Sequence, residues 1–281
     1  MRIMLTASAL RAHAVGRRTL AANKFVDRKR SALAALGLFL LASLPCAATE
    51  RDFAINSLQP LPPGTTVPVE LARAMKAGSV KVGTRFVVRT TQRIPVGPHR
   101  YLPRGVEVLG EVIASDNGDA AAGKPSMLTL DFSELVWKGQ SVPVRAKTIA
   151  IANFVQVMDA AVIATGATDR GNPDPAGWTT NQVGGDQVYR SGWRGDVYSS
   201  YSHKVGFADY HGVYASPKTP QSLPQALGVF STTSSGLYGF AGSTMLSGEG
   251  SKTTISDLSR AVVLRKGDDL LLQVSCERVG K

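Results

Sequence analysis

The chain has 281 residues, of which 43% are hydrophobic, 19% charged and 7% aromatic. This length allows one or two domains, and the apolar fraction excludes wholesale disorder. The formal net charge of +11 would suit a nucleic-acid-binding protein if the basic residues were spread along the chain, but they are concentrated at its start.

The first 48 residues have the pattern of a secretory signal peptide. Residues 1–30 contain eight basic side chains against the single acid Asp27, and the run 31–44 is apolar and uncharged. Cys46 and Ala48 place small residues at the −3 and −1 positions of a cleavage site. The run is shorter than the about 20 residues that a membrane-spanning helix needs. We expect cleavage after Ala48 and export to the periplasm or cell envelope with no membrane span, an uncleaved anchor being the alternative.

Residues 49–281 are nearly balanced in charge. Eight of the 32 basic and one of the 21 acidic residues belong to 1–48, which leaves 24 basic and 20 acidic residues and a net charge of +4. We therefore expect no nucleic-acid partner. Cys276 is the one cysteine of this part, so a hydrophobic core rather than a disulfide has to hold the fold. Its apolar neighbours favour a buried strand residue over a nucleophile.

Residues 64–150 are predicted to form the first part of a β-domain, after a proline-containing linker at 49–63. Apolar residues recur at every second position, β-branched residues are frequent, and Gly or Pro turns separate the runs. Pro68 in the first strand suggests that this strand lies at a sheet edge. The expected strands are 65–71, 83–91, 106–113, 127–132, 134–137 and 141–146, with a loop at 116–125. The pattern predicts an all-β barrel or sandwich of short antiparallel strands.

Residues 151–222 differ in composition and are predicted to be an irregular insertion. The segment 153–165 fits a strand or a helix, and residues 166–222 are rich in Gly, Ser, Asp and aromatic rings. Strands return over 223–281 and are expected to complete the same barrel. They are predicted at 226–230, 236–240, 261–265 and 270–274, with the turn Lys266–Asp268 joining the last two as a hairpin.

Four segments of the two strand blocks share the pattern of one known family. They are Pro62–Leu71, Leu102–Gly110, Leu128–Phe132 with Gly139–Val144, and Val263–Val274. These segments resemble, in the same order, the TrbI-type β-barrel, the scaffold component of bacterial type IV secretion and conjugation machines. The resemblance implies that the first and last strands close one barrel and that the protein is a structural or assembly module. A predicted signal peptide stands where that family has a transmembrane helix and a Pro-rich stalk, so the likeness is to a stand-alone exported relative.

The aromatic part of the insertion is the leading candidate for a binding surface. Eight aromatic residues fall within 178–214, interspersed with amides, hydroxyls and glycines. Such surfaces stack on sugars or anchor a protein partner. The alternative is that the rings cover one end of the barrel and form a second small core. The candidate ligand or partner residues are Trp178, Tyr189, Arg190, Trp193, Tyr198 and Tyr201.

Patterns for catalysis, cofactors and metals are weak, and we expect none of the three. His203 and His211 are eight residues apart with Asp209 between them, which is more typical of loop histidines than of a metal site. The acids of 116–119 faintly resemble a calcium loop but lack the later carboxylate, so a solvated turn is expected. Neither a Gly-x-Ser-x-Gly elbow nor a phosphate-binding glycine loop is present.

The sequence therefore predicts a non-enzymatic, exported envelope protein that serves as a structural or assembly module. Its expected partners are other envelope proteins or further copies of itself. One alternative is a glycan- or protein-binding module that uses the aromatic segment 178–214. A second alternative is a hydrolase whose unrecognised site would join an acid to His203 or His211.

Overall fold

The computed structural model describes residues 53–54, 57–161, 178–191, 194–248 and 250–275, all within the unit Thr49–Lys281. The predicted signal peptide and Cys276 lie outside these residues. The described chain consists of strands and one short helix, α1 (Phe154–Ala161), so the predicted all-β class is confirmed. Helix α1 resolves the ambiguity that the sequence left at 153–165.

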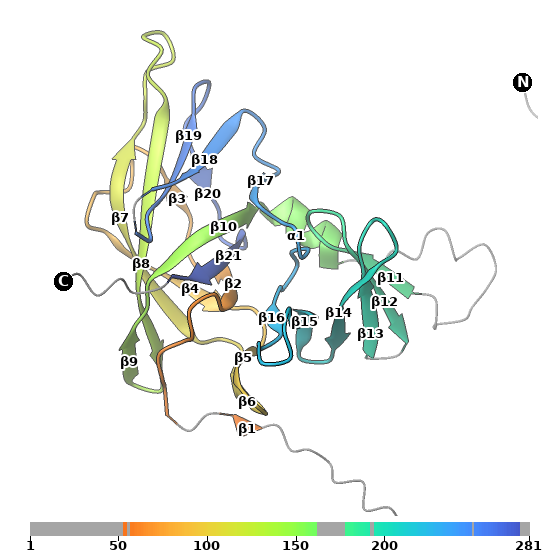
Figure 1. Cartoon of the computed structure of the whole chain (residues 1–281). Helices are drawn as coiled ribbons and strands as arrows, with labels where there is room; N and C mark the ends of the chain where they lie inside the picture. Colours follow the sequence, from red (N-terminus) through yellow and green to blue (C-terminus); the bar gives the residue numbers. More distant parts are fainter. Residues whose placement is uncertain (1–52, 55–56, 162–177, 192–193, 249, 276–281) are drawn as a thin grey trace, which may run out of the picture. The chain divides into compact units, whose positions relative to one another are not determined.

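The largest sheet of the described chain is a nearly closed barrel (Figure 1). Its strands follow the order β17-β10-β21-β2-β4-β7-β8-β19-β18, with β9 paired to β8 beside this path. The two end strands, β17 and β18, lie next to each other, which nearly closes the sheet. The bounds are β2 Thr66–Leu71, β4 Arg85–Thr90, β7 Glu107–Asp116, β8 Ser126–Trp137, β9 Gln140–Pro143, β10 Ala146–Ala152, β17 Gly236–Tyr238, β18 Ser243–Ser247, β19 Thr253–Asp257 and β21 Asp269–Val274.

Strand β2 is an interior strand, so the prediction that Pro68 marks a sheet edge is wrong. β2 pairs with β21 on one side and with β4 on the other. The β2–β4 ladder begins only at the pair Val69↔Thr90, one residue after the proline. On the side that faces β4, the Pro68 carbonyl accepts a hydrogen bond from the backbone N–H of Thr91 at 3.0 Å. Proline has no backbone N–H to donate, but at the end of the β2–β4 ladder no ladder bond requires one. An interior strand therefore tolerates a proline at this position.

Strand β8 is one long strand where the sequence suggested two. Its pairing with β7 shifts register between Leu109↔Glu134 and Gly110↔Phe132, so Ser133 is the extra residue of a β-bulge. The bulge changes which face the following side chains point to, and Phe132 and Leu135 are both buried in consequence. The break in alternation at Ser133 is what made the segment read as two strands.

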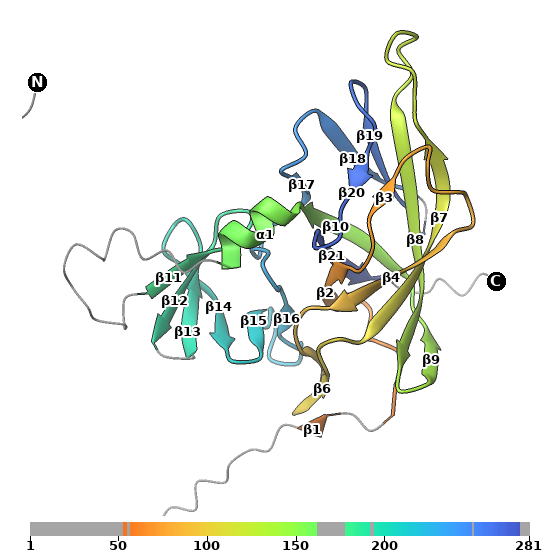
Figure 2. The ribbon, with the colours of Figure 1, turned by 180° about the vertical axis from the view of Figure 1, so that it is seen from behind.

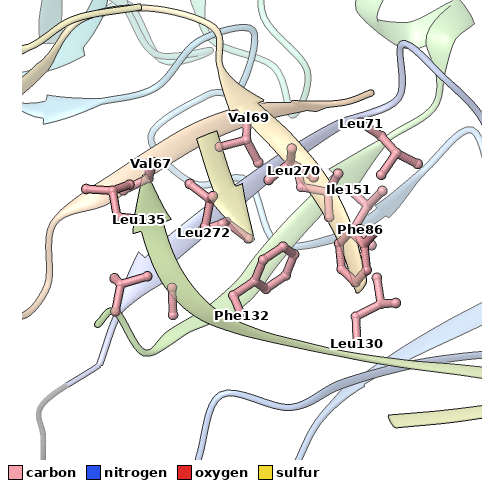
Figure 3. Packing of buried hydrophobic residues seen from close by; sticks show 14 of the residues in the cluster. Val67, Val69, Leu71, Phe86, Leu130, Phe132, Leu135, Ile151, Leu270 and Leu272 are labelled. Atoms are coloured by element: carbon pink, nitrogen blue, oxygen red, sulfur yellow. The ribbon is translucent and has the colours of Figure 1, made fainter. Parts of the chain in front are cut away.

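The barrel encloses one main hydrophobic core (Figure 3). Phe86 and Phe132 meet edge to face at its centre, with ring centroids 5.5 Å apart. Gly110 is directly opposite Phe86, and a Cβ at this position would lie 2.3 Å from the ring, so only glycine admits the ring there. Aliphatic side chains from β2, β8, β10 and β21 fill the rest. They are Val67, Val69, Leu71, Leu130, Leu135, Ile151, Leu270 and Leu272.

The C-terminal strands differ from the prediction in their partners. The expected hairpin across Lys266–Asp268 is wrong: β20 (Val263–Leu264) pairs with β3 (Met75–Lys76), and β21 pairs with β2 and β10. The strand expected at 226–230 is reduced to β16 (Gln225–Ala226). Strand β19 was not predicted because two of its inward positions, Thr253 and Asp257, are polar and hide the alternation.

A second sheet contains six strands in simple sequence order, β11 to β16. Its strands are β11 Trp178–Asn181, β12 Gln187–Ser191, β13 Arg194–Tyr198, β14 Lys204–Asp209, β15 Gly212–Ala215 and β16 Gln225–Ala226, all antiparallel. A small third sheet joins β1 (Phe53–Ala54), β6 (Arg100–Leu102) and β5 (Ile94–Gly97). The segment that the sequence treated as irregular is therefore largely a regular meander.

Two glutamine side chains join the second sheet to the barrel. Gln92 accepts hydrogen bonds from the backbone N–H groups of Val213 and Gly228, at 3.0 and 2.9 Å, and donates to the Val213 carbonyl at 2.9 Å. In the opposite direction, Gln225 accepts from the backbone N–H of Thr66 at 2.9 Å. Each glutamine side chain thus hydrogen-bonds to backbone groups that belong to the neighbouring sheet or its loops. Figures 1 and 2 show β15 and β16 beside the barrel and β11 to β13 away from it.

Candidate ligand-binding cleft

The two faces of the second sheet carry different chemistry. One face holds a small aliphatic core that is made of Val188, Val197, Ala208, Val213 and Leu227. These residues follow the period of two that places alternate side chains on one face of a strand. No described aromatic side chain belongs to this small core, but Tyr214 is part of the barrel core and Phe207 packs against it.

The opposite face of β12, β13 and β14 carries eight described positions in three rows, which we call the grid. The strand registers set the rows: Tyr189↔Asp196↔Phe207 is the central row, and Gln187↔Tyr198↔Lys204 lies beside it. Arg194 and Asp209, each next to a member of the pair Gly195↔Ala208, form the third row. A cavity of about 1140 Å³ is lined by the grid positions other than Lys204 and by Ser199, Ser200 and Ser202. The grid therefore forms the floor of a cleft.

The rings of the grid divide between the cleft and the barrel. Tyr189 and Tyr198 meet edge to face with centroids 5.3 Å apart, and both line the cleft. Phe207 also lines the cleft, while its ring stacks on Tyr214 at 5.2 Å. Tyr214 is 2% exposed and donates its hydroxyl to the Arg93 carbonyl of the barrel. Phe207 and Tyr214 thus fix the cleft floor to the scaffold, and the two other tyrosines remain accessible.

Asp196 occupies the centre of the grid and is engaged on both oxygens. Oδ1 pairs with the Lys204 ammonium at 2.7 Å, and Oδ2 accepts from the Tyr198 hydroxyl at 3.4 Å. The hydrogen bond to Asp196 raises the pKa of Lys204, which favours the charged ammonium. Asp209 accepts from the backbone N–H groups of His211 and Gly212 through Oδ1. The two acids of the cleft are therefore balanced by Arg194, which also lines it, and by Lys204, which lies beside it.

The residues predicted from the sequence reach different places. Tyr189 and Tyr198 line the cleft, and Tyr201 is 82% exposed between two of its lining serines. The backbones of Trp178 and Arg190 belong to β11 and β12, but their side chains lie outside the described residues, as does the whole of Trp193.

Four lining residues were missed because the segment was treated as irregular. They are Gln187, Arg194, Asp196 and Phe207; the small lining residues, among them Ser199, Ser200 and Ser202, and Asp209, which was noted only as the acid between two histidines, were also not predicted. Alternation within β12 to β14, in which Val188, Val197 and Ala208 mark the buried face, was the signal that could have found them.

The histidines of the segment are not among the residues that line the cleft. His211 accepts a hydrogen bond at Nε2 from the Arg93 guanidinium at 2.8 Å, and His203 is exposed. Neither lines the cleft as the described residues define it. The pocket that would have characterised the hydrolase alternative is therefore not formed by the described side chains.

The remaining candidate sites form turns. In the 116–119 segment, Asp116 pairs with Lys124 at 2.5 Å, and this hydrogen bond lowers the pKa of Asp116. Asp119 accepts from two backbone N–H groups of the same loop. No group of three or more His, Cys, Asp or Glu side chains suited to a metal ion occurs among the described residues.

A second cluster of polar groups lies where β2 and β21 pair. Asp269 is buried directly opposite Glu70, and burial together with Glu70 and Asp268 raises the pKa of Asp269 to about 7, against the opposing effect of Arg104. Asp268 caps α1 by accepting from the backbone N–H of Phe154. These carboxylates line no part of the cleft.

Comparison with family models, with curated proteins and with solved structures finds no match to this chain. Among the described residues, no helix has the length and apolarity needed to cross a membrane.

Proposed function

We propose that the protein is a non-enzymatic, exported module of the bacterial cell envelope that binds a ligand in the cleft over β12 to β14. The observation that carries the proposal is the one-sided chemistry of the second sheet: aliphatic below, and an open grid of tyrosines, acids and bases above. A sheet that served only to cover the barrel would not need this grid on its accessible face. Cavities of this size with a few convergent polar groups are the usual form of a ligand site.

The barrel supplies a rigid base for this site. Its strands are closed around one core, and the Gln92, Gln225 and Tyr214 contacts fix the second sheet to it. Binding residues placed on strands rather than on loops are held more precisely. The arrangement supports a binding role, in which the scaffold presents a preformed surface to the envelope.

The binding proposal is tested by retention on envelope material. We expect the full chain, expressed in a bacterium and purified as the cell delivers it, to co-sediment with isolated envelopes. Tyr198→Ala should reduce the retained fraction strongly, because it removes a ring and the hydroxyl that contacts Asp196. Tyr210→Ala is the matched control, because Tyr210 is 63% exposed in the turn between β14 and β15 and does not line the cleft. Equal retention of the two variants would contradict the proposal.

Export is tested by the N-terminus of the recovered protein. We expect mass spectrometry of the envelope fraction to find a chain that begins at Thr49. A chain that keeps residues 1–48 and stays in the cytoplasm would refute export.

A role as an assembly module is the second candidate, and the pairing of β2 with β21 favours it. This pairing places Thr66–Glu70 beside Asp269–Gln273, which joins the first and last of the segments that resemble the TrbI-type barrel. We expect cross-linking in the envelope and size-exclusion chromatography to detect an assembly of several copies or with another envelope protein. A strict monomer without such a partner would count against this role.

A further inference from the structure

The cleft lies on the face of a sheet, and this position limits the ligands that it suits. The backbone N–H and C=O groups of β12, β13 and β14 are paired in the ladder on both sides of β13. An extended peptide binds mainly through such backbone groups, which are free at a sheet edge and not on its face. Recognition over the strands of the cleft floor therefore depends on side chains.

The charges in and beside the cleft further limit the class of ligand that it suits. Asp196, Asp209 and Arg194 line the cleft, and Lys204, beside the lining, pairs with Asp196 at 2.7 Å, so that the four charges cancel. A phosphate or nucleotide site needs a surplus of cationic or N–H donors, which this grid does not hold among its described side chains. The balance of charge favours a neutral ligand that is rich in hydrogen-bonding groups.

The central row has the chemistry of a sugar platform. Asp196 stands between the rings of Tyr189 and Phe207, which are two strands or about 10 Å apart. A pyranose presents apolar C–H groups on its face, which pack on an aromatic ring, and hydroxyls around its rim, which a carboxylate and an ammonium can bind. Tyr198 and Lys204, both in contact with Asp196, add a hydroxyl and a donor beside the row.

We infer that the cleft binds a neutral oligosaccharide, with sugar rings over Tyr189, Tyr198 and Phe207 and hydroxyls on Asp196 and Lys204. The inference rests on the proposed binding function of this cleft and names its ligand class. Ser199, Ser200 and Ser202 extend the polar lining at the end of β13 and leave room for a chain longer than one sugar.

Isothermal titration of the full chain with chitotetraose, maltotetraose and inorganic phosphate tests the inference. We expect saturable binding of at least one of the two neutral tetrasaccharides and none of phosphate. Tyr198→Ala should raise Kd by about tenfold or more, and Asp196→Asn by about tenfold. Tyr198→Phe, which keeps the ring and removes the hydroxyl, should raise Kd by about threefold and guards against misfolding of the alanine variant. Tyr210→Ala should leave Kd unchanged.

The outcomes separate this inference from the function on which it rests. Absence of saturable binding of both tetrasaccharides at millimolar concentration overturns the saccharide class, as does tighter binding of phosphate. Saccharide binding that survives both Tyr198→Ala and Asp196→Asn overturns the location. If envelope retention depends on Tyr198 while neither saccharide binds, the binding module stands and the saccharide inference fails.

Discussion

Gln92 should be one of the most sensitive polar positions in the protein. The residue is 4% exposed, and its amide makes three hydrogen bonds to the backbone of the second sheet, with Val213 N, Val213 O and Gly228 N. In Gln92→Ala these three groups lose their partner at a site closed to solvent. Each buried group left unpaired costs about 1–3 kcal/mol, so we expect the three together to lower the free energy of unfolding by about 3–9 kcal/mol. That loss is a large part of the about 5–15 kcal/mol that stabilises a typical domain.

Two matched variants test whether the loss of stability comes from these hydrogen bonds. Gln92→Glu keeps both acceptor contacts to Val213 N and Gly228 N but places a carboxylate oxygen against the Val213 carbonyl, so we expect an intermediate loss. Gln59→Ala is the exposed control, because Gln59 makes a solvent-accessible bond to the Arg100 side chain. Its effect should stay within about 0.5 kcal/mol.

Urea unfolding followed by circular dichroism gives the free energies, and amide exchange locates the loss. Val213 and Gly228 should exchange much faster in Gln92→Ala than in the parent protein, because their N–H groups lose the acceptor. A destabilisation below about 1 kcal/mol, with unchanged exchange at these two amides, would refute the view that Gln92 holds the sheets together.

Three further predictions concern the barrel and its loops. Because the pKa of buried Asp269 is raised to about 7, the folded state holds this proton more tightly than the unfolded state does. The free energy of unfolding should therefore decrease by on the order of 4 kcal/mol as pH rises from about 4 to about 7. Asp269→Asn should flatten this part of the pH profile of urea unfolding, and an unchanged slope would contradict the assignment. Gly184→Ala should lower the free energy of unfolding by about 2–4 kcal/mol, because the new Cβ would lie 2.5 Å from Ser234 Oγ. Gly185 has a similar φ of +109° but open space around it, so Gly185→Ala should lower it by only about 1 kcal/mol. Equal values for the two variants in thermal unfolding would show that the contact with Ser234 is unimportant. Asp257→Ala should lower the free energy of unfolding by about 2–3 kcal/mol, since buried Asp257 accepts hydrogen bonds from Ser243 Oγ, Ser259 N and Arg260 N. Denaturant unfolding that matches the parent protein would contradict this role for the carboxylate.

Local patterns were enough for the strands that have one buried face and hydrophobic side chains at its inward positions. Strands β4 and β7 follow the period of two, with Phe86, Val88, Val108 and Val112 buried, and both fall within or overlap the predicted ranges. The turn at Lys138–Gly139 was also predictable, because positive φ values of 49° and 74° suit glycine and few other residues. These features depend on neighbours within a few positions of the chain.

Strands with polar inward positions were not predictable in this way. Thr253 and Asp257 in β19 are buried with hydrogen-bond partners from other parts of the chain: Thr253 accepts from the backbone N–H of Thr148, 105 positions away, and Asp257 accepts from the Ser243 hydroxyl, 14 positions away. The pairing of β20 with β3 rather than with β21 likewise depends on a contact between residues almost 190 positions apart, as in Val263↔Lys76. Sequence proximity favoured the hairpin, and the closure of the barrel by β2 excluded it.

The sequence by itself determined the all-β class, most strands of the first block and the change of character after residue 151, since these follow from alternation, turn residues and composition. It also supplied Tyr189 and Tyr198 as candidates, because rings in a polar segment are visible in one dimension. Only the tertiary structure decided which side chains share the cleft with them. The register of three strands places Asp196 between Tyr189 and Phe207, and register is set by backbone pairing across turns, with the aliphatic face buried below.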